Sequence, residues 1–184
     1  MNDEKLTEKF VKGETKYEGK IVKIVRDTVL LPDGNTAFRE VVRKGSGVCV
    51  VPLTDDGNVV TVRQYRYPYA EIILEAPAGK TEKDEDPAKC AERELSEETG
   101  YTAKKLVPLG IFYPSPGIMD EYLYLYAATG LVKGKTHPDE DEFVEPGLIP
   151  LEKFVDMILD GKVRDGKTQA AVLRVYLMKQ RGLL

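Results

Sequence analysis

Alternating apolar and polar residues predict β-strands in much of the first half of the chain. Residues 17–31 and 36–44 are rich in Val and Ile, and the PDGN segment between them is typical of a tight turn, so they predict a hairpin. Residues 47–53 and 58–67 flank a TDDG segment and predict a second hairpin. Further strands are expected at residues 72–74, 106–112 and 122–128.

Three segments predict helices. The clearest is 87–99, because Asp86 is placed to cap it, Pro87 suits its first position and Gly100 suits its end. The other two are expected at residues 151–161 and 168–180. Strands and helices follow one another without a βαβα rhythm. The fold class expected is therefore α+β, with a mixed sheet covered by helices.

Composition and charge narrow the class of protein. Of the 184 residues, 42% are hydrophobic, which is enough to fill the core of one domain. The net charge of −4 lacks the basic surplus that bulk binding to nucleic acid needs, so no nucleic-acid partner is expected. The N-terminus has no apolar signal core, and the longest apolar run, residues 48–53, is far too short to cross a bilayer. We therefore expect a cytoplasmic protein with no membrane partner.

The histidine and cysteine residues indicate neither a metal site nor a catalytic relay. A single histidine, His137, excludes multi-histidine metal sites and argues against a Ser–His relay. The two cysteines, Cys49 and Cys90, form neither a disulfide framework nor a zinc-ligand spacing.

The predicted helix 87–99 carries an unusual group of carboxylates. At roughly 100° per residue, Glu94, Glu97 and Glu98 fall within one sector of about 100°. Carboxylates so placed repel one another, and the negative end of the helix dipole disfavours them further. A hard divalent cation such as Mg²⁺ would neutralise them, since it prefers oxygen ligands. The alternative is a solvated acidic face.

The spacing of the residues around these glutamates favours a cation site over a solvated acidic face. Read from residue 79 to residue 101, the fixed positions are Gly79, Glu85, the Arg93-Glu94-Leu95 triplet, the Glu97-Glu98 pair and Gly100. This pattern resembles the Nudix box at every fixed polar and glycine position, although Tyr101 stands where that family usually has an aliphatic residue. The resemblance implies an α/β/α sandwich with a mixed β-sheet and a small additional N-terminal antiparallel sheet.

The resemblance also implies roles for these residues. Glu94 and Glu98 resemble the metal ligands, with Glu97 as a further ligand or catalytic carboxylate and the Ala78 carbonyl as a backbone ligand. Glu85 would be a weaker ligand or would support the others. We expect Gly79 to let the chain turn sharply out of a strand, and Arg93 to orient Glu97 or to reach back to Glu85.

A second resemblance narrows the family to its ADP-ribose pyrophosphatase subgroup. Pro116 lies fifteen residues beyond Tyr101, within an SPG segment that an acidic residue follows, and this offset is similar to that subgroup's signature. Members of the subgroup exchange an N-terminal sheet across a homodimer. The resemblance thus divides the chain into a dimerisation region, 1–44, and a catalytic domain, 45–184.

The same resemblance implies substrate contacts and a base. Arg66 is the first candidate to bind a substrate phosphate or ribose, with Arg39 and Arg63 as weaker ones, and each has the alternative of an exposed strand residue. Glu142 is the first choice for the catalytic base and Glu140 the second, in a loop that a solvated acidic segment would also explain. Tyrosines at 65, 67 and 69 either stack on adenine or pack.

Together these resemblances imply hydrolysis of ADP-ribose to AMP and ribose 5-phosphate, with two or three Mg²⁺ ions and with Mn²⁺ as their substitute. Two alternatives remain open. One is a pyrophosphatase for another nucleoside diphosphate sugar, such as GDP-mannose or ADP-glucose, and the other is a module that senses ADP-ribose without cleaving it.

Overall fold

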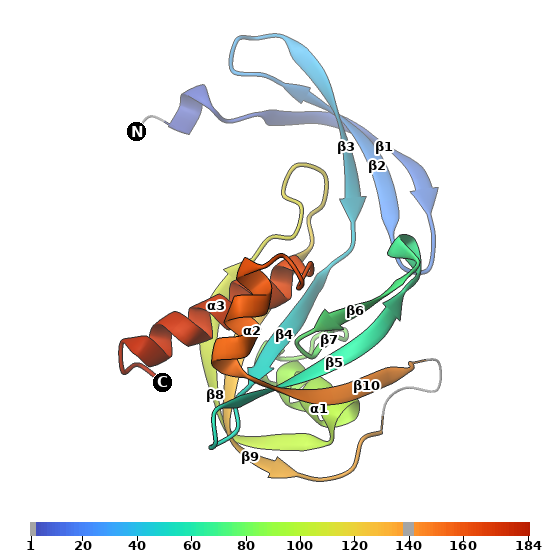
Figure 1. Cartoon of the computed structure of the whole chain (residues 1–184). Helices are drawn as coiled ribbons and strands as arrows, with labels where there is room; N and C mark the ends of the chain where they lie inside the picture. Colours follow the sequence, from blue (N-terminus) through green and yellow to red (C-terminus); the bar gives the residue numbers. More distant parts are fainter. Residues whose placement is uncertain (1–2, 138–141) are drawn as a thin grey trace. The chain divides into compact units, whose positions relative to one another are not determined.

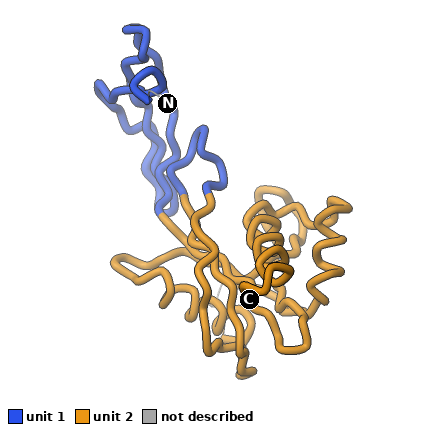
Figure 2. Tube along the Cα trace, turned by 90° about the vertical axis from the view of Figure 1, so that its left-hand side faces the viewer, with its two compact units in different colours: residues 1–45, 113–121 blue, residues 46–112, 122–184 orange. Residues whose placement is uncertain are grey.

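The structure is a computed structural model that describes residues 3–137 and 142–184. Its strands are β1 (Lys9–Glu18), β2 (Lys23–Leu30), β3 (Thr36–Arg43), β4 (Ser46–Pro52), β5 (Asn58–Arg66), β6 (Glu71–Glu75), β7 (Ala78–Lys80), β8 (Tyr101–Phe112), β9 (Tyr122–Lys133) and β10 (Val144–Pro150) (Figure 1). Its helices are α1 (Pro87–Thr99), α2 (Leu151–Leu159) and α3 (Gly166–Gln180), with short 3₁₀ helices at Asp3–Lys5 and Tyr67–Tyr69. The chain divides into unit 1, residues 1–45 and 113–121, and unit 2, residues 46–112 and 122–184 (Figure 2).

Unit 1 contains the antiparallel sheet β1-β2-β3. The predicted turn between β2 and β3 is confirmed, with Gly34 at a φ of 87°. The single strand expected at 17–31 is wrong, because β1 ends at Glu18 and β2 begins only at Lys23. Every residue of β1 is exposed, and its sequence, KFVKGETKYE, has no apolar face that would have predicted it as a strand.

The segment 113–121 joins unit 1 by pairing with β3. The Val42 N–H donates to the Ile118 carbonyl at 2.8 Å, and the Asp120 N–H donates to the Val42 carbonyl at 3.2 Å. Next to them, the Lys44 ammonium lies 2.6 Å from the Glu121 carboxylate. This segment is thus bound to the N-terminal sheet although it is distant in sequence.

Unit 2 contains two sheets, β7-β4-β9-β8 and β10-β5-β6. The predicted hairpin of β4 and β5 is therefore wrong. Its turn does form, since the Thr54 N–H donates to the Asn58 carbonyl at 2.9 Å, but beyond the single bridge between Leu53 and Val59 the strands separate. Both edges of β4 are occupied, by β7 on one side and by parallel β9 on the other, so β5 has no edge to pair with.

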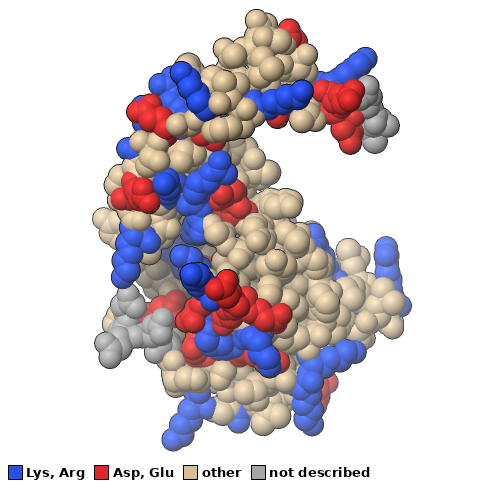
Figure 3. Space-filling view, turned by 180° about the vertical axis from the view of Figure 1, so that it is seen from behind, with Lys and Arg blue, Asp and Glu red and all other residues tan. Residues whose placement is uncertain are grey.

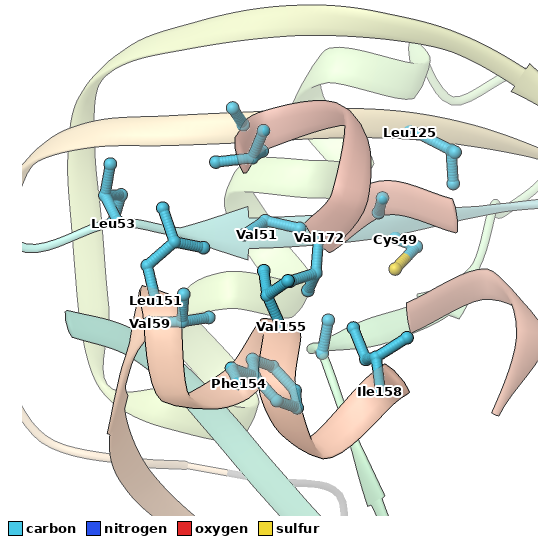
Figure 4. Close-up of a cluster of buried hydrophobic side chains, with 14 of the residues drawn as sticks. Cys49, Val51, Leu53, Val59, Leu125, Leu151, Phe154, Val155, Ile158 and Val172 are labelled. Atoms are coloured by element: carbon cyan, nitrogen blue, oxygen red, sulfur yellow. The ribbon is translucent and has the colours of Figure 1, made fainter. Parts of the chain in front are cut away.

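Strand β4 is buried on both faces and organises the core of unit 2. One face of β4 packs against α1 through Val48, Val50, Cys90, Ala91 and Leu95. The opposite face packs against α2 and α3, in a cluster that includes Cys49, Val51, Phe154, Val155, Ala171 and Val172 (Figure 4). Mixed sheets with helices on both sides confirm the expected α+β sandwich and the additional antiparallel sheet.

The sequence left strand β10 of unit 2 unpredicted. Strand β10 has Pro146, Gly147 and Pro150 among its seven residues, and these weaken any strand signal. It is tolerated because it lies at the edge of its sheet. No helix within the described residues is long and apolar enough to cross a membrane.

Candidate active site

Helix α1 presents the carboxylate group, and both of its ends form as predicted. The Asp86 carboxylate accepts hydrogen bonds from the backbone N–H groups of Ala88 and Lys89 at 2.9 and 3.2 Å. At the other end Gly100 has a φ of 73°, and its N–H donates to the Ser96 carbonyl at 2.9 Å. The helix is thereby fixed in register, with its buried stripe of Cys90, Ala91 and Leu95 turned to β4.

The Arg93 guanidinium connects three carboxylates. Its Nε and Nη2 donate to the two oxygens of Glu85 at 3.0 and 3.1 Å, and its Nη1 donates to Glu94 at 2.8 Å and to Glu97 at 2.9 Å. Arg93 therefore makes both contacts that the sequence offered as alternatives. Its hydrogen bonds lower the pKa of Glu85 to about 2. Figure 3 shows one face of the molecule, on which acidic and basic side chains lie side by side.

Glu94 and Glu98 are the two buried carboxylates of this helix, with exposed fractions of 7% and 1%. Burial raises the pKa of Glu94 to about 7, against the opposing effect of Arg93. Burial, and then the charge of Glu142, raise the pKa of Glu98 to about 8. The Ala78 N–H donates to Glu98 Oε2 at 3.1 Å, which brings the backbone expected to supply a metal ligand next to this carboxylate.

Gly79 makes room for Glu94. A Cβ atom at this position would overlap all three atoms of the Glu94 carboxyl group. Gly79 lies in the short strand β7 and has no positive φ, so the sharp turn that the sequence led us to expect is not the reason for a glycine here. The reason is the close approach of a charged side chain to the backbone.

The donor atoms of this site fit a hard divalent cation. Glu94 and Glu98 supply carboxylate oxygens in a buried setting where their negative charges are costly, and a cation would offset that cost. Among the described residues, no three His, Cys, Asp or Glu side chains converge to enclose an ion by themselves. This is compatible with Mg²⁺, which usually retains waters and binds substrate phosphates in addition to one or two carboxylates.

The raised pKa values predict how the ion-free protein responds to pH. Between the ordinary value of 4.5 and the raised value of about 8, Glu98 binds more protons in the folded state than in the unfolded state. The free energy of unfolding should therefore fall as pH rises, by at most about 1.4 kcal/mol per pH unit for such a group. In EDTA we expect a lower melting temperature at pH 8 than at pH 6, and Glu98→Gln should flatten that slope. An equal slope in the variant would contradict the assignment.

The predicted base falls near this cluster. The charge of Glu142 raises the pKa of Glu98 more than the charge of Glu94 does, and it raises the pKa of Glu94 as well. Glu140, the second choice, lies outside the described residues.

Strand β5 brings Arg66 to the same region. The pKa of Arg66 is raised, mainly by its hydrogen bonds to Glu75 and to a smaller extent by the negative charge of Glu98. Arg66 Nε and Nη2 donate to the two Glu75 oxygens at 2.6 and 2.8 Å, and the Lys167 ammonium pairs with the same carboxylate. Glu75 and Lys167 were not predicted. The only local sign of Glu75 in the sequence was a glutamate within the apolar segment ILEAPA. No local pattern points to Lys167, because the tertiary fold brings it to Glu75.

The other predicted substrate residues make different contacts. Arg63 is paired with Glu145 at 2.9 Å across β5 and β10, and it is exposed. Arg39 pairs with Glu8 and lies in unit 1, as does Pro116. The tyrosines at 65, 67 and 69 are 55%, 85% and 72% exposed, so they are not core packing residues.

Comparisons with known proteins agree with this geometry. The NUDIX domain family matches residues 43–173. The chain is 41% identical over 174 residues to the ADP-ribose pyrophosphatase of Bacillus subtilis (strain 168), covering 94% of each chain. It is 43% identical over 178 residues to the methanol dehydrogenase activator of Bacillus methanolicus, covering 96% of this chain and 95% of that one. Its fold is similar to the crystal structure of an ADP compounds hydrolase, with a TM-score of 0.85 and 21% identity over 97% of both chains. The resemblance of the box is confirmed, and the chain belongs to the NUDIX domain family.

Proposed function

We propose that this chain hydrolyses the diphosphate bond of ADP-ribose to give AMP and ribose 5-phosphate, with Mg²⁺ as its cofactor. The observation that carries the proposal is a buried pair of carboxylates, Glu94 and Glu98, on one face of α1. Of the two, Glu98 lies within the electrostatic reach of the Arg66 guanidinium. Carboxylates for a cation and a guanidinium for a phosphate are the two elements that cleavage of a diphosphate needs. The name of the Bacillus subtilis relative supports ADP-ribose as the substrate.

The metal would be held by Glu94, Glu98 and the Ala78 carbonyl, with Glu97 as a further ligand. When bound, two or three Mg²⁺ ions would neutralise the diphosphate and lower the pKa of a water molecule, and Mn²⁺ would substitute for them. Arg93 holds Glu94 and Glu97 in place through its Nη1.

Side chains carry out the remaining steps of the proposed reaction, which are phosphate binding and proton transfer. Arg66 binds and orients a phosphate, and Glu142 accepts the proton of the attacking water, with Glu140 as the alternative base. Arg39, Arg63 and Pro116 are proposed as weaker substrate contacts. We place the base in the segment that precedes β10, because a loop can bring a catalytic residue to the substrate as it closes over it.

We also propose that the chain is a cytoplasmic homodimer that pairs through residues 1–44. The three-stranded sheet of unit 1 and the turn between β1 and β2 leave large apolar side chains exposed, including Phe10 at 68%, Ile21 at 62% and Phe38 at 59%. A sheet of this size gains little stability unless it packs against another surface. Light scattering coupled to size exclusion would test the dimer, and a monomer of 20.6 kDa would contradict it.

A substrate panel tests the proposed reaction. The purified protein would be incubated in Mg²⁺ with ADP-ribose, GDP-mannose, ADP-glucose and dinucleoside polyphosphates, and phosphatase-sensitive product would be measured. We expect the highest kcat/KM with ADP-ribose and no turnover in EDTA. Faster cleavage of GDP-mannose would move the assignment to another nucleotide sugar. Tight binding of ADP-ribose without turnover would indicate a sensing module instead.

A further inference from the structure

The Arg66 guanidinium is held along one edge only. Its Nε and Nη2 donate to Glu75, and among the described residues Nη1 donates no hydrogen bond. An arginine has two edges that can each bind an oxyanion with two parallel N–H groups. The edge formed by Nη1 and Nη2 therefore remains able to meet a phosphate, and Glu75 sets the direction in which it points.

Glu75 by itself would also cancel the charge of Arg66. Its side chain is buried, at 2% exposed, so its negative charge is weakly screened by solvent. Burial opposes its ionisation, but the hydrogen bonds and charges of Arg66 and Lys167 outweigh burial and lower its pKa. Glu75 is thus an ionised carboxylate directly behind the guanidinium.

The positive charge of Lys167 offsets the negative charge of Glu75. Its ammonium pairs with Glu75 Oε2 and lies 3.0 Å from Asp165, and its side chain is 14% exposed. The two cations and the two carboxylates of this group, Arg66, Lys167, Glu75 and Asp165, sum to zero charge. Without Lys167 the sum would be −1, close to the place where Arg66 would meet an anionic substrate.

The first turn of α3 holds Lys167 in this position. Asp165 caps the helix by accepting from the Thr168 N–H at 3.0 Å. The Thr168 hydroxyl in turn accepts from the Ala76 N–H at 2.8 Å, and Thr168 is fully buried. Because Ala76 directly follows Glu75, helix and strand are joined at adjacent residues, and the ammonium has little freedom to move away.

We propose that Lys167 is a positioning residue that acts through Glu75, setting the direction of the Arg66 guanidinium and preserving its positive charge for the diphosphate of the substrate. The inference rests on the proposed function for the identity of the substrate. It does not depend on the metal carboxylates of α1.

The test is Lys167→Met, with Lys167→Arg as the conservative variant and Lys162→Met as the matched control. Lys162 is an exposed lysine just before α3, paired with Asp160 at 2.7 Å. Losing a charge-assisted contact should raise KM for ADP-ribose about tenfold or more, and lower kcat less. The Mg²⁺ concentration for half-maximal activity should not change. Lys167→Arg should stay within about threefold of wild type, because the charge is retained, and Lys162→Met should match wild type. An unchanged KM in Lys167→Met would overturn the inference.

A double-mutant cycle separates positioning from a merely structural role. In an Arg66→Ala background, Lys167→Met should have no further effect on KM, because the group through which it acts is absent. An effect of equal size in both backgrounds would overturn the inference. If Lys167→Met does not fold, Glu75→Gln takes its place in the same cycle, since it removes the carboxylate that directs Arg66 at nearly constant size.

A binding measurement keeps this test distinct from that of the proposed function. If wild type does not cleave ADP-ribose, the proposed reaction fails, but the inference is still tested by calorimetric titration of ADP. Weaker ADP binding by Lys167→Met than by Lys162→Met would support it. Equal binding by the two variants would overturn it.

Discussion

Replacing Glu98 by glutamine is expected to reduce kcat/KM for ADP-ribose by about 100- to 10,000-fold, the range that removal of a metal ligand or an oxyanion donor produces. Glutamine keeps the size of the side chain and can still accept the hydrogen bond that the Ala78 N–H donates to Glu98. What it removes is a buried negative charge, and that charge is the reason a cation would bind.

The same substitution should not destabilise the protein. Because burial raises the pKa of Glu98 to about 8, the ionised form is unfavourable in the folded state at neutral pH. A neutral isostere avoids this cost, and each kcal/mol recovered raises the melting temperature by about 2–4 °C in a protein of this size. Loss of activity with an equal or higher melting temperature is the combined result expected, since stability is given up for a charged site.

Kinetics and thermal melts of the purified variant would check this expectation. Glu92→Gln is the matched control, because Glu92 lies on the same helix with a side chain that is 50% exposed and, within the described part of the chain, pairs only with Lys89. Its activity should stay within about twofold of wild type, as expected for an exposed pair. Turnover retained in Glu98→Gln would show that Glu98 is not a metal ligand.

Gly79→Ala is expected to lower kcat by about 10- to 100-fold, because a misplacement of roughly 1 Å at a reacting centre costs this much. The added Cβ would occupy the volume of the Glu94 carboxyl group, and that carboxylate would have to move. Arg93 would move with it, since its Nη1 bonds both Glu94 and Glu97. One methyl group would thus disturb two carboxylates that are proposed as metal ligands.

Metal titration of the activity would distinguish this mechanism from general damage. We expect Gly79→Ala to need more Mg²⁺ for half-maximal activity, with a loss of stability of about 1–3 kcal/mol from crowding. Gly166→Ala is the control, because the one described side chain that its Cβ would meet is Phe112, at an ordinary 3.6 Å. A Gly79→Ala enzyme with normal activity and normal Mg²⁺ dependence would exclude close approach to Glu94 as the reason for this glycine.

Local features of the site could be predicted because they depend on residues a few positions apart. Asp86, Pro87 and Gly100 act on the backbone next to them, so the limits of α1 follow from capping chemistry. The grouping of Glu94 with Glu98 follows from the helical period alone. The family was recognisable for the same reason, since its fixed positions lie within one continuous segment.

Features that depend on pairing between distant segments could not be predicted. The hairpin expected from β4 and β5 is wrong because β7 and β9 take both edges of β4, and nothing in residues 46–66 indicates this competition. Gly79 was assigned to a turn because its contact with Glu94, fifteen positions away in the sequence, is not visible in a local pattern.

By itself the sequence determined the helix that carries the carboxylates, the kind of ion that suits them and the family, because capping, periodicity and motif spacing act over less than 25 residues. Only the tertiary structure decided that Glu94 and Glu98 are buried deeply enough to have raised pKa values, that Gly79 lies beneath Glu94, and that Lys167 stands behind Glu75 and Arg66. Burial and charge pairing depend on which distant strands and helices pack together, and the free energy of the whole core selects that packing.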